Sequence, residues 1–86
     1  MRYFFNLAGA VYDPDNEGVE LDSPAQARHH AVVFAGEVIK DQPSLVWTGN
    51  ELRVEVTDDG RMVMCTIIVV GVDAPLYVPP RPRHAR

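Results

Sequence analysis

Cysteine is nearly absent from this sequence, since Cys65 is the only one among its 86 residues. A single cysteine excludes an internal disulfide framework, and we expect a cytoplasmic location, where disulfides are rare. Basic residues are also few: eight Lys and Arg stand against twelve Asp and Glu, a formal net charge of −4. Proteins that bind nucleic acid through electrostatic attraction usually present a basic surface. The negative net charge therefore argues against nucleic acid as a partner.

Long apolar runs are missing as well. The longest, residues 62–72, is interrupted by Thr66 and Gly71 and reaches about half the length of a membrane-spanning helix. The aromatic residues near the N-terminus are followed at once by Asn6, which leaves too short a segment for a signal-peptide core. We therefore expect a soluble protein with no membrane partner and no secretion signal.

The length suits one domain, which we place at residues 1–78. The last eight residues, 79–86, are rich in proline and arginine, and we expect them to form a disordered tail. The tail carries Arg81, Arg83 and Arg86 and no acid. The other residues therefore hold twelve acids against five bases, a formal charge of −7, so an acidic body is joined to a basic tail.

One helix is marked by local signals. Ser23 is an N-cap residue, Pro24 suits the first helical position, and Gln26 completes a capping box. The sequence Asp41-Gln42-Pro43 ends the helix, because the residue before a proline disfavours helical backbone. We predict a helix over residues 24–40 whose apolar stripe consists of Ala27, Ala31, Phe34, Ala35 and Val38.

The remaining elements are predicted to be strands. The clearest is residues 52–56, where apolar and polar residues alternate, followed by an Asp58-Asp59-Gly60 turn. Further extended segments are expected at residues 3–7, 11–12, 19–21, 62–70 and 76–78. The order ββ(β)αββ predicts an α+β fold, with an antiparallel sheet of about four strands and one helix packed on one face.

Four short motifs in this order resemble a known family. They are an Arg-Tyr-Phe-Phe start, an acidic segment with Asp15, Gly18, Glu20 and Leu21, an alanine-rich helix, and Leu-x-Val-Glu-Val-x-Asp with a Gly-Arg turn at residues 52–61. Together they are similar to a large family of small, uncharacterised proteins common in alphaproteobacteria, catalogued as a domain of unknown function. The resemblance covers residues 2–72 and implies a small bacterial protein with this element order, and it supplies no catalytic residues. At Asn6 the family often has histidine or aspartate.

We considered metal binding and catalysis in turn. Asp13, Asp15 and Glu17 match the first half of a calcium loop, but Pro24 stands where the last ligand, a glutamate, belongs. His29 and His30 are adjacent on the predicted helix, so they point about 100° apart and cannot chelate one ion. Ser23 is a helix cap and Cys65 lies in an apolar strand, so neither suggests a nucleophile. We expect no enzyme activity and assign no catalytic residue, cofactor or metal.

Two predicted strands, residues 3–5 and 67–70, are apolar on both faces. A single helix covers only one face, so either residues 45–47 or 76–78 fold over the other, or a second subunit covers it by face-to-face packing or edge pairing. We favour a homodimer, because an unprotected Ile-Ile-Val-Val strand invites aggregation. The predicted interaction surface consists of Tyr3, Phe5, Trp47, Ile68 and Val70.

These observations predict a non-enzymatic protein–protein interaction module with an unknown protein partner. The alternative is a nucleic-acid-linked regulator that uses the basic tail, since the element order is loosely similar to that of HicB-like antitoxins. Salt-sensitive binding to nucleic acid that is lost on removal of residues 79–86 would favour the regulator.

Overall fold

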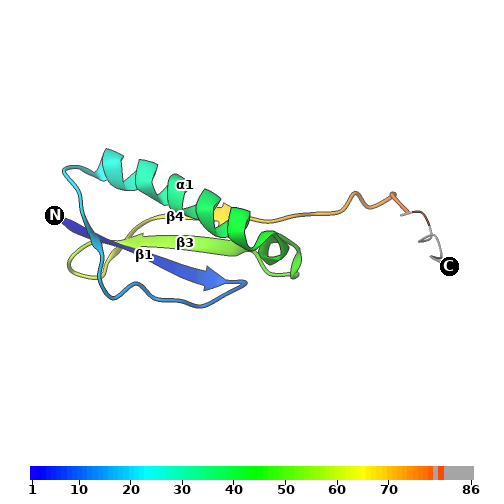
Figure 1. Ribbon diagram of the computed structural model, residues 1–86, viewed down its shortest axis with the longest axis horizontal. Coiled ribbons are helices and arrows are strands. Elements are labelled where there is room, and N and C mark those ends of the chain that lie inside the picture. The colour runs from blue at the N-terminus through cyan, green and yellow to red at the C-terminus, as the bar shows by residue number, and fades with distance from the viewer. Residues whose placement is uncertain (79, 81–86) are drawn as a thin grey trace.

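The computed structural model describes residues 1–78 and 80. Its elements are, in chain order, β1 (Arg2–Gly9), β2 (Val19–Glu20), α1 (Pro24–Asp41), a short 3-10 helix η1 (Pro43–Trp47), β3 (Leu52–Thr57) and β4 (Val63–Val69). The strands form one antiparallel sheet in the order β2-β1-β3-β4, and α1 lies across one face of it (Figure 1). The predicted α+β fold, with about four strands and a single helix, is confirmed.

Helix α1 begins where its capping residues predict. The Ser23 side chain accepts a hydrogen bond from the Gln26 backbone N–H at 3.2 Å, and the Gln26 side chain accepts one from the Asp22 N–H at 2.8 Å. These two bonds satisfy backbone donors that the first turn leaves without intrahelical partners. The predicted span of residues 24–40 is confirmed to within one residue.

The core lies between α1 and the sheet. Three alanines of the helix, Ala27, Ala31 and Ala35, are buried and face alternate residues of the two central strands. These strand residues are Tyr3, Phe5 and Leu7 of β1 and Leu52, Val54 and Val56 of β3. Alanine side chains let the helix lie close to the sheet, and each fully buried Leu or Val stabilises the fold by about 1.5–3 kcal/mol. The alternation predicted for residues 52–56 is confirmed.

A tight turn joins β3 to β4. The Asp58 carboxylate accepts hydrogen bonds from the backbone N–H groups of Gly60 at 2.9 Å and Met62 at 3.0 Å. Arg61 adopts a φ of 65°, in the left-handed region that few non-glycine residues enter. The predicted turn at residues 58–60 is therefore confirmed, with its left-handed residue at Arg61.

Two predicted extended segments differ from the structure. Val11-Tyr12 is not a strand: residues 10–18 run beside β1 as a loop, with one isolated bridge between Leu7 and Asp13. Residues 76–78 also form no strand, and a turn in which the Tyr77 N–H bonds to the Ala74 carbonyl at 3.1 Å interrupts the segment. Residues 72–78 lead away from the body of the protein (Figure 1), so they cover no part of the sheet.

Candidate functional site

One side chain helps to close the outer edge of β1, between its pairing with β2 at Tyr3 and the backbone bridge from Leu7 to Asp13. The carboxylate of Asp15 accepts hydrogen bonds from the backbone N–H groups of Phe5 at 3.1 Å, Glu17 at 3.0 Å and Gly18 at 3.0 Å. The Phe5 donor belongs to β1, so Asp15 supplies an acceptor that a neighbouring strand would otherwise provide. The other two donors belong to the loop, so the same carboxylate also fixes the loop's shape.

Asn6 extends this network across the sheet. Its side-chain oxygen accepts a hydrogen bond from the Asp15 N–H at 2.9 Å, and its side-chain nitrogen donates to the Glu55 carbonyl of β3 at 3.0 Å. The loop is thereby tied to both central strands, because Asn6 uses its donor and its acceptor at once.

Opposing effects act on the Asp15 carboxyl. Partial burial acts to raise its pKa, but the N–H groups of Gly18, Phe5 and Glu17, together with the positive charge of Arg61, outweigh burial. The pKa of Asp15 is therefore held below its usual value. The group stays charged in the folded protein at neutral pH, which its three hydrogen bonds require.

Arg61 covers the side of β1 that faces away from α1. Its guanidinium carbon lies 4.0 Å from the centroid of the Phe4 ring, and its Nη1 donates to the Asp15 carbonyl at 3.4 Å. Gly18 packs against the same ring, since a Cβ at this position would lie 2.9 Å from Phe4 Cε2. Phe4 is thus buried within the chain although it points away from the helix.

Four of the motif residues singled out in the sequence meet in this cluster: Phe4, Asp15, Gly18 and Arg61. Arg2 joins them by donating to the Glu17 carbonyl at 2.8 Å. The Asp-x-x-Gly spacing of Asp15 and Gly18 is typical of a turn closed by an aspartate side chain, so the sequence alone could have indicated this turn. No local signal pairs Arg61 with Phe4, because the two are brought together only by strand pairing.

A cavity of about 460 Å³ lies between the loop and α1, on the Phe5 side of β1. Its apolar lining comes from Phe5, Val19 and Phe34, and its polar lining includes Asp13, Glu17 and His30. The His30 ring contacts Phe5 with a centroid separation of 4.5 Å. A smaller hollow of about 440 Å³ lies nearby against His29 and His30. The larger of these two cavities is lined by both aromatic and charged groups, which makes it the candidate binding site.

The three acidic residues considered for calcium take different positions. Asp15 is occupied by backbone N–H groups, whereas Asp13 and Glu17 line the cavity. Within residues 1–78 and 80, no group of three or more His, Cys, Asp or Glu side chains is arranged to hold a metal ion. His29 is exposed while His30 packs on Phe5.

The predicted interaction surface is only partly exposed. Tyr3 and Phe5 are 3% and 4% exposed, so including them was wrong: alternation along β1 turns both toward α1. Trp47, Ile68 and Val70 are exposed by more than half, as an interaction surface requires. Trp47 also packs on Gly71, where a Cβ would lie 2.7 Å from the indole. Arg81, Arg83 and Arg86 lie outside the described residues.

The exposed apolar surface of the sheet is concentrated at β4. This strand pairs with β3 on one side, and no strand of the described part of the chain pairs with its other side. Ile68 is 61% and Val63 is 54% exposed. Over β3, the same face is polar: Arg53 forms ion pairs with Glu51 at 2.7 Å and Glu55 at 3.3 Å.

The comparisons with known proteins give one match. A family model described as "Domain of unknown function (DUF6894)" matches residues 2–70, in agreement with the resemblance of the motifs. No curated protein and no solved structure matches. In the part of the chain that the structure describes, no helix is long and apolar enough to cross a membrane.

Proposed function

This chain belongs to the family of the domain of unknown function DUF6894, and we propose that it is a non-enzymatic interaction module that pairs with a second copy of itself through the free edge of β4. The observation that carries this proposal is the edge itself. β4 presents seven residues, Val63–Val69, without a proline, glycine or charge. Natural proteins commonly protect an exposed edge with a proline or a charged side chain, and β4 has neither.

Edge pairing fits the two faces of the sheet better than face-to-face packing does. Packing the faces together would bury Arg53 with Glu51 and Glu55, and the desolvation of such ion pairs is costly. Pairing along β4 leaves this ion-pair group in water and covers the apolar side chains beside the edge. Antiparallel pairing of one strand with its own copy is also two-fold symmetric, which is the usual symmetry of homodimers.

Helix α1 adds a second apolar contribution on the β4 side. Helical spacing places Val32 on the flank opposite His30 and Phe34, which line the cavity next to β1. Val32 is 58% exposed on the α1 face of the sheet, whereas Ile68, in register with Arg53, is exposed on the opposite face, so apolar side chains flank the edge from both faces. Neither Val32 nor any residue of β4 is charged, so two acidic bodies meet there with little repulsion.

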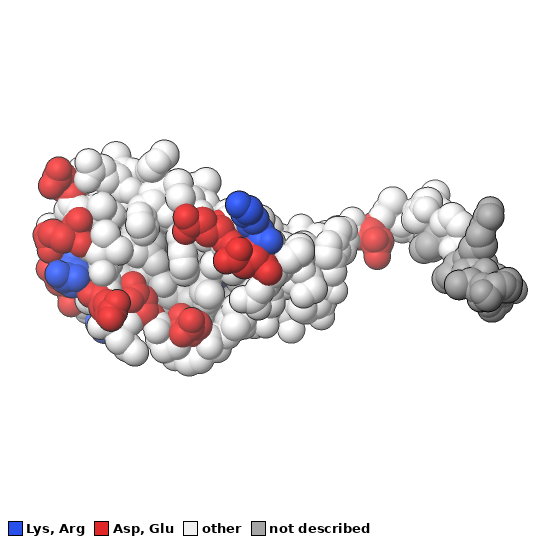
Figure 2. Space-filling model, in the orientation of Figure 1, with Lys and Arg blue, Asp and Glu red and all other residues white. Residues whose placement is uncertain are grey.

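The nucleic-acid alternative gains nothing from the described residues. Of the five basic residues in this part of the chain, Arg53 is paired with carboxylates, Arg2 is bonded to the loop and Arg61 covers Phe4. The other two, Arg28 and Lys40, are exposed on α1. The face shown in Figure 2 carries more acidic than basic side chains. Arg28 and Lys40 stand twelve positions apart on α1, about 18 Å, so they form no basic cluster that would bind phosphates.

The proposal is tested by the mass of the native protein and of an Ile68→Lys variant, measured by light scattering after size exclusion at tens of micromolar, with Arg81, Arg83 and Arg86 changed to glutamine in every chain so that only the β4 edge is compared. We expect a dimer, about twice 9.6 kDa, for the chain that keeps Ile68 and a monomer for Ile68→Lys, because an edge lysine opposes strand pairing. Val33→Lys is the matched control. It replaces another exposed β-branched apolar side chain, on the solvent side of α1, and this variant should remain a dimer. A monomer of the chain that keeps Ile68 would refute the proposal.

A further inference from the structure

We infer that the cavity between residues 13–17 and α1 binds the Pro/Arg-rich C-terminal segment, residues 79–86, of a second copy of this chain. The site is the cavity of about 460 Å³ described above, whose apolar part is formed by Phe5, Phe34 and Val19. Aromatic-lined grooves of this kind bind proline-rich segments, because such segments lose little conformational entropy on binding. Residues 79–86 include three prolines, Pro79, Pro80 and Pro82.

The charges of the cavity and of the segment are complementary. Asp13 and Glu17 line the cavity, and within the described residues neither carboxylate has a salt-bridge partner. Arg2 and Arg61 bind the same loop from the Phe4 side of β1, whereas the cavity lies on the Phe5 side. The segment carries three arginines and no acid, so opposite charges meet on the cavity side.

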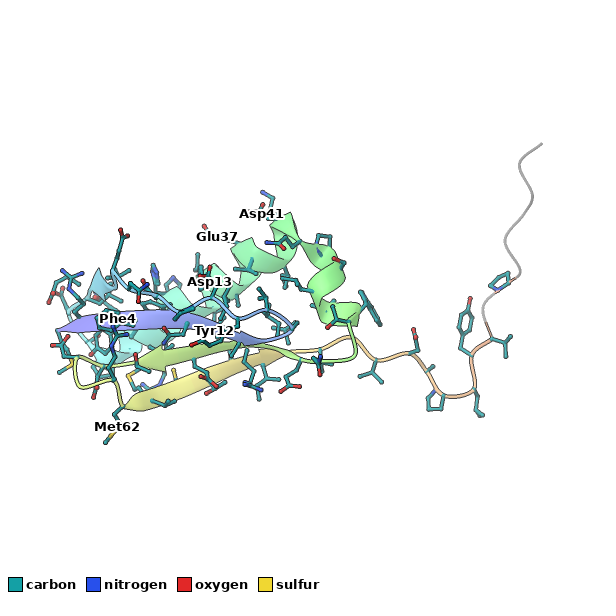
Figure 3. All side chains as sticks on the ribbon, turned by 90° about the horizontal axis from the view of Figure 1, so that it is seen from below. Phe4, Tyr12, Asp13, Glu37, Asp41 and Met62 are labelled. Atoms are coloured by element: carbon teal, nitrogen blue, oxygen red, sulfur yellow. The ribbon has the colours of Figure 1, made fainter. Side chains whose placement is uncertain are left out.

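The acidic surface continues along the helix beside the cavity. Glu37 and Asp41 follow His30 and Phe34 at helical spacing, so they lie on the same flank of α1. Figure 3 shows both farther along α1, on the side of the molecule where Asp13 lies. The face in Figure 2 is correspondingly rich in carboxylates, which attract a basic segment from a distance.

The path of the chain favours a second copy over the segment's own body. Residues 72–78 lead away from the body (Figure 1), and Leu76 and Val78 are 95% and 84% exposed. Eight residues beyond this point span at most about 28 Å, whereas the described molecule is 57 Å long. Residues 79–86 therefore start at a point that projects from the body, where the cavity of a neighbouring molecule is easier to reach than the cavity of the same chain.

Binding is tested with a fluorescent peptide of residues 76–86 and, as receptor, the full-length chain carrying Arg81→Gln, Arg83→Gln and Arg86→Gln. These changes leave the described residues intact and remove competition from the receptor's own arginines. We expect saturable binding by fluorescence anisotropy at low salt that weakens as salt is raised.

Two variants of this receptor decide whether the cavity is the site. Asp13→Asn with Glu17→Gln should weaken binding about tenfold, whereas Asp59→Asn with Asp73→Asn, which removes the same charge away from the cavity, should weaken it by less than about twofold. The circular dichroism of both variants should match that of the parent. Absence of saturable binding, or an equal loss in both variants, would overturn the assignment.

The role of the second copy is tested by NMR in a mixture. We expect the amide signals of Asp13, Asp15, Asn16 and Glu17 in a ¹⁵N-labelled receptor chain to shift when unlabelled native chain is added, and not when unlabelled Arg→Gln chain is added. Unshifted signals with the native chain would overturn binding between copies. Both unlabelled chains retain β4, so edge pairing cannot produce the difference, and the two proposals fail or succeed separately.

Discussion

The Asp15 carboxylate accepts a hydrogen bond from the Phe5 backbone N–H at 3.1 Å, and this contact makes a loop serve as the outer neighbour of β1. Between the bridge at Asp13 and the start of β2 at Val19, the carboxylate takes the place of a strand carbonyl. The loop can therefore turn its acidic residues toward the cavity while the edge of β1 stays satisfied. The stability of the loop and the geometry of the candidate site depend on the same side chain.

Replacing Asp15 by asparagine should destabilise the fold. An amide retains one acceptor oxygen and has no negative charge, so the three N–H groups of Phe5, Glu17 and Gly18 lose charge-assisted hydrogen bonds. We expect Asp15→Asn to lower the free energy of unfolding by about 1–3 kcal/mol, measured by urea denaturation. Asp13→Asn, two residues away on the cavity rim, should change it by less than about 0.5 kcal/mol. Equal effects of the two changes would contradict the role of Asp15.

The contribution of Asp15 should depend on pH. Its pKa in the folded protein lies below the value of an unfolded aspartate, so the unfolded state binds the proton first as the pH falls. The stability difference between the native chain and Asp15→Asn should therefore be constant above about pH 5 and shrink below about pH 4. Urea midpoints of both proteins across this range test the expectation. A difference that grows on acidification would contradict it.

Gly18 should tolerate no side chain. Its φ is 74°, and a Cβ would lie 2.8 Å from Arg2 Cγ and 2.9 Å from both Phe4 Cε2 and the Tyr3 carbonyl oxygen. Gly49 is a matched control because its φ is 94° but nothing lies within 4 Å of an added Cβ. We expect Gly49→Ala to cost about 1 kcal/mol from backbone strain alone and Gly18→Ala about 3 kcal/mol, since crowding is added. Thermal or urea unfolding measures both, and equal losses would show that the crowding is absent.

Arg61 combines an unfavourable backbone with a favourable stacking contact. Its φ of 65° favours glycine, whereas its guanidinium covers the Phe4 ring. Arg61→Ala keeps the backbone strain and loses the stacking, so we expect a loss of about 1 kcal/mol. Arg61→Gly also relieves the strain and should be close to neutral, within about 0.5 kcal/mol. If glycine destabilises as much as alanine, the strain at this position contributes nothing measurable.

Local signals predict much of the fold. Ser23, Pro24 and Gln26 mark the start of α1 because a cap depends on residues that are close in sequence. The alternation at residues 52–56 predicts β3 for the same reason, since the period of a strand is visible within a few residues. The 3-10 helix η1 was not predicted, and its Leu45 packs against the core only once α1 and the sheet are in place.

The candidate site depends on contacts that no local pattern specifies. The sequence around Phe4 does not indicate whether a second subunit or another residue of the same chain covers its ring. The residue that covers it is Arg61, which is 57 positions away in the sequence and is brought to Phe4 by strand pairing. The run Tyr3-Phe4-Phe5 is apolar at every position, so the sequence does not show which of its side chains face the helix. The sequence places Phe5 at an interaction surface, whereas in the structure α1 buries it. Ile68 of β4 and Val70, just beyond its end, are exposed, and no strand of the described chain pairs with the outer edge of β4.

The free edge of β4 is tested most directly by hydrogen exchange of its backbone amides, followed by NMR at tens of micromolar. In a monomer, alternate amides of an edge strand point away from the sheet and exchange quickly. In the proposed dimer a second β4 binds these amides, so protection should extend without alternation along residues 63–69 of the native chain and become alternating in Ile68→Lys. Alternating protection in the native chain would contradict the pairing of two copies along this edge.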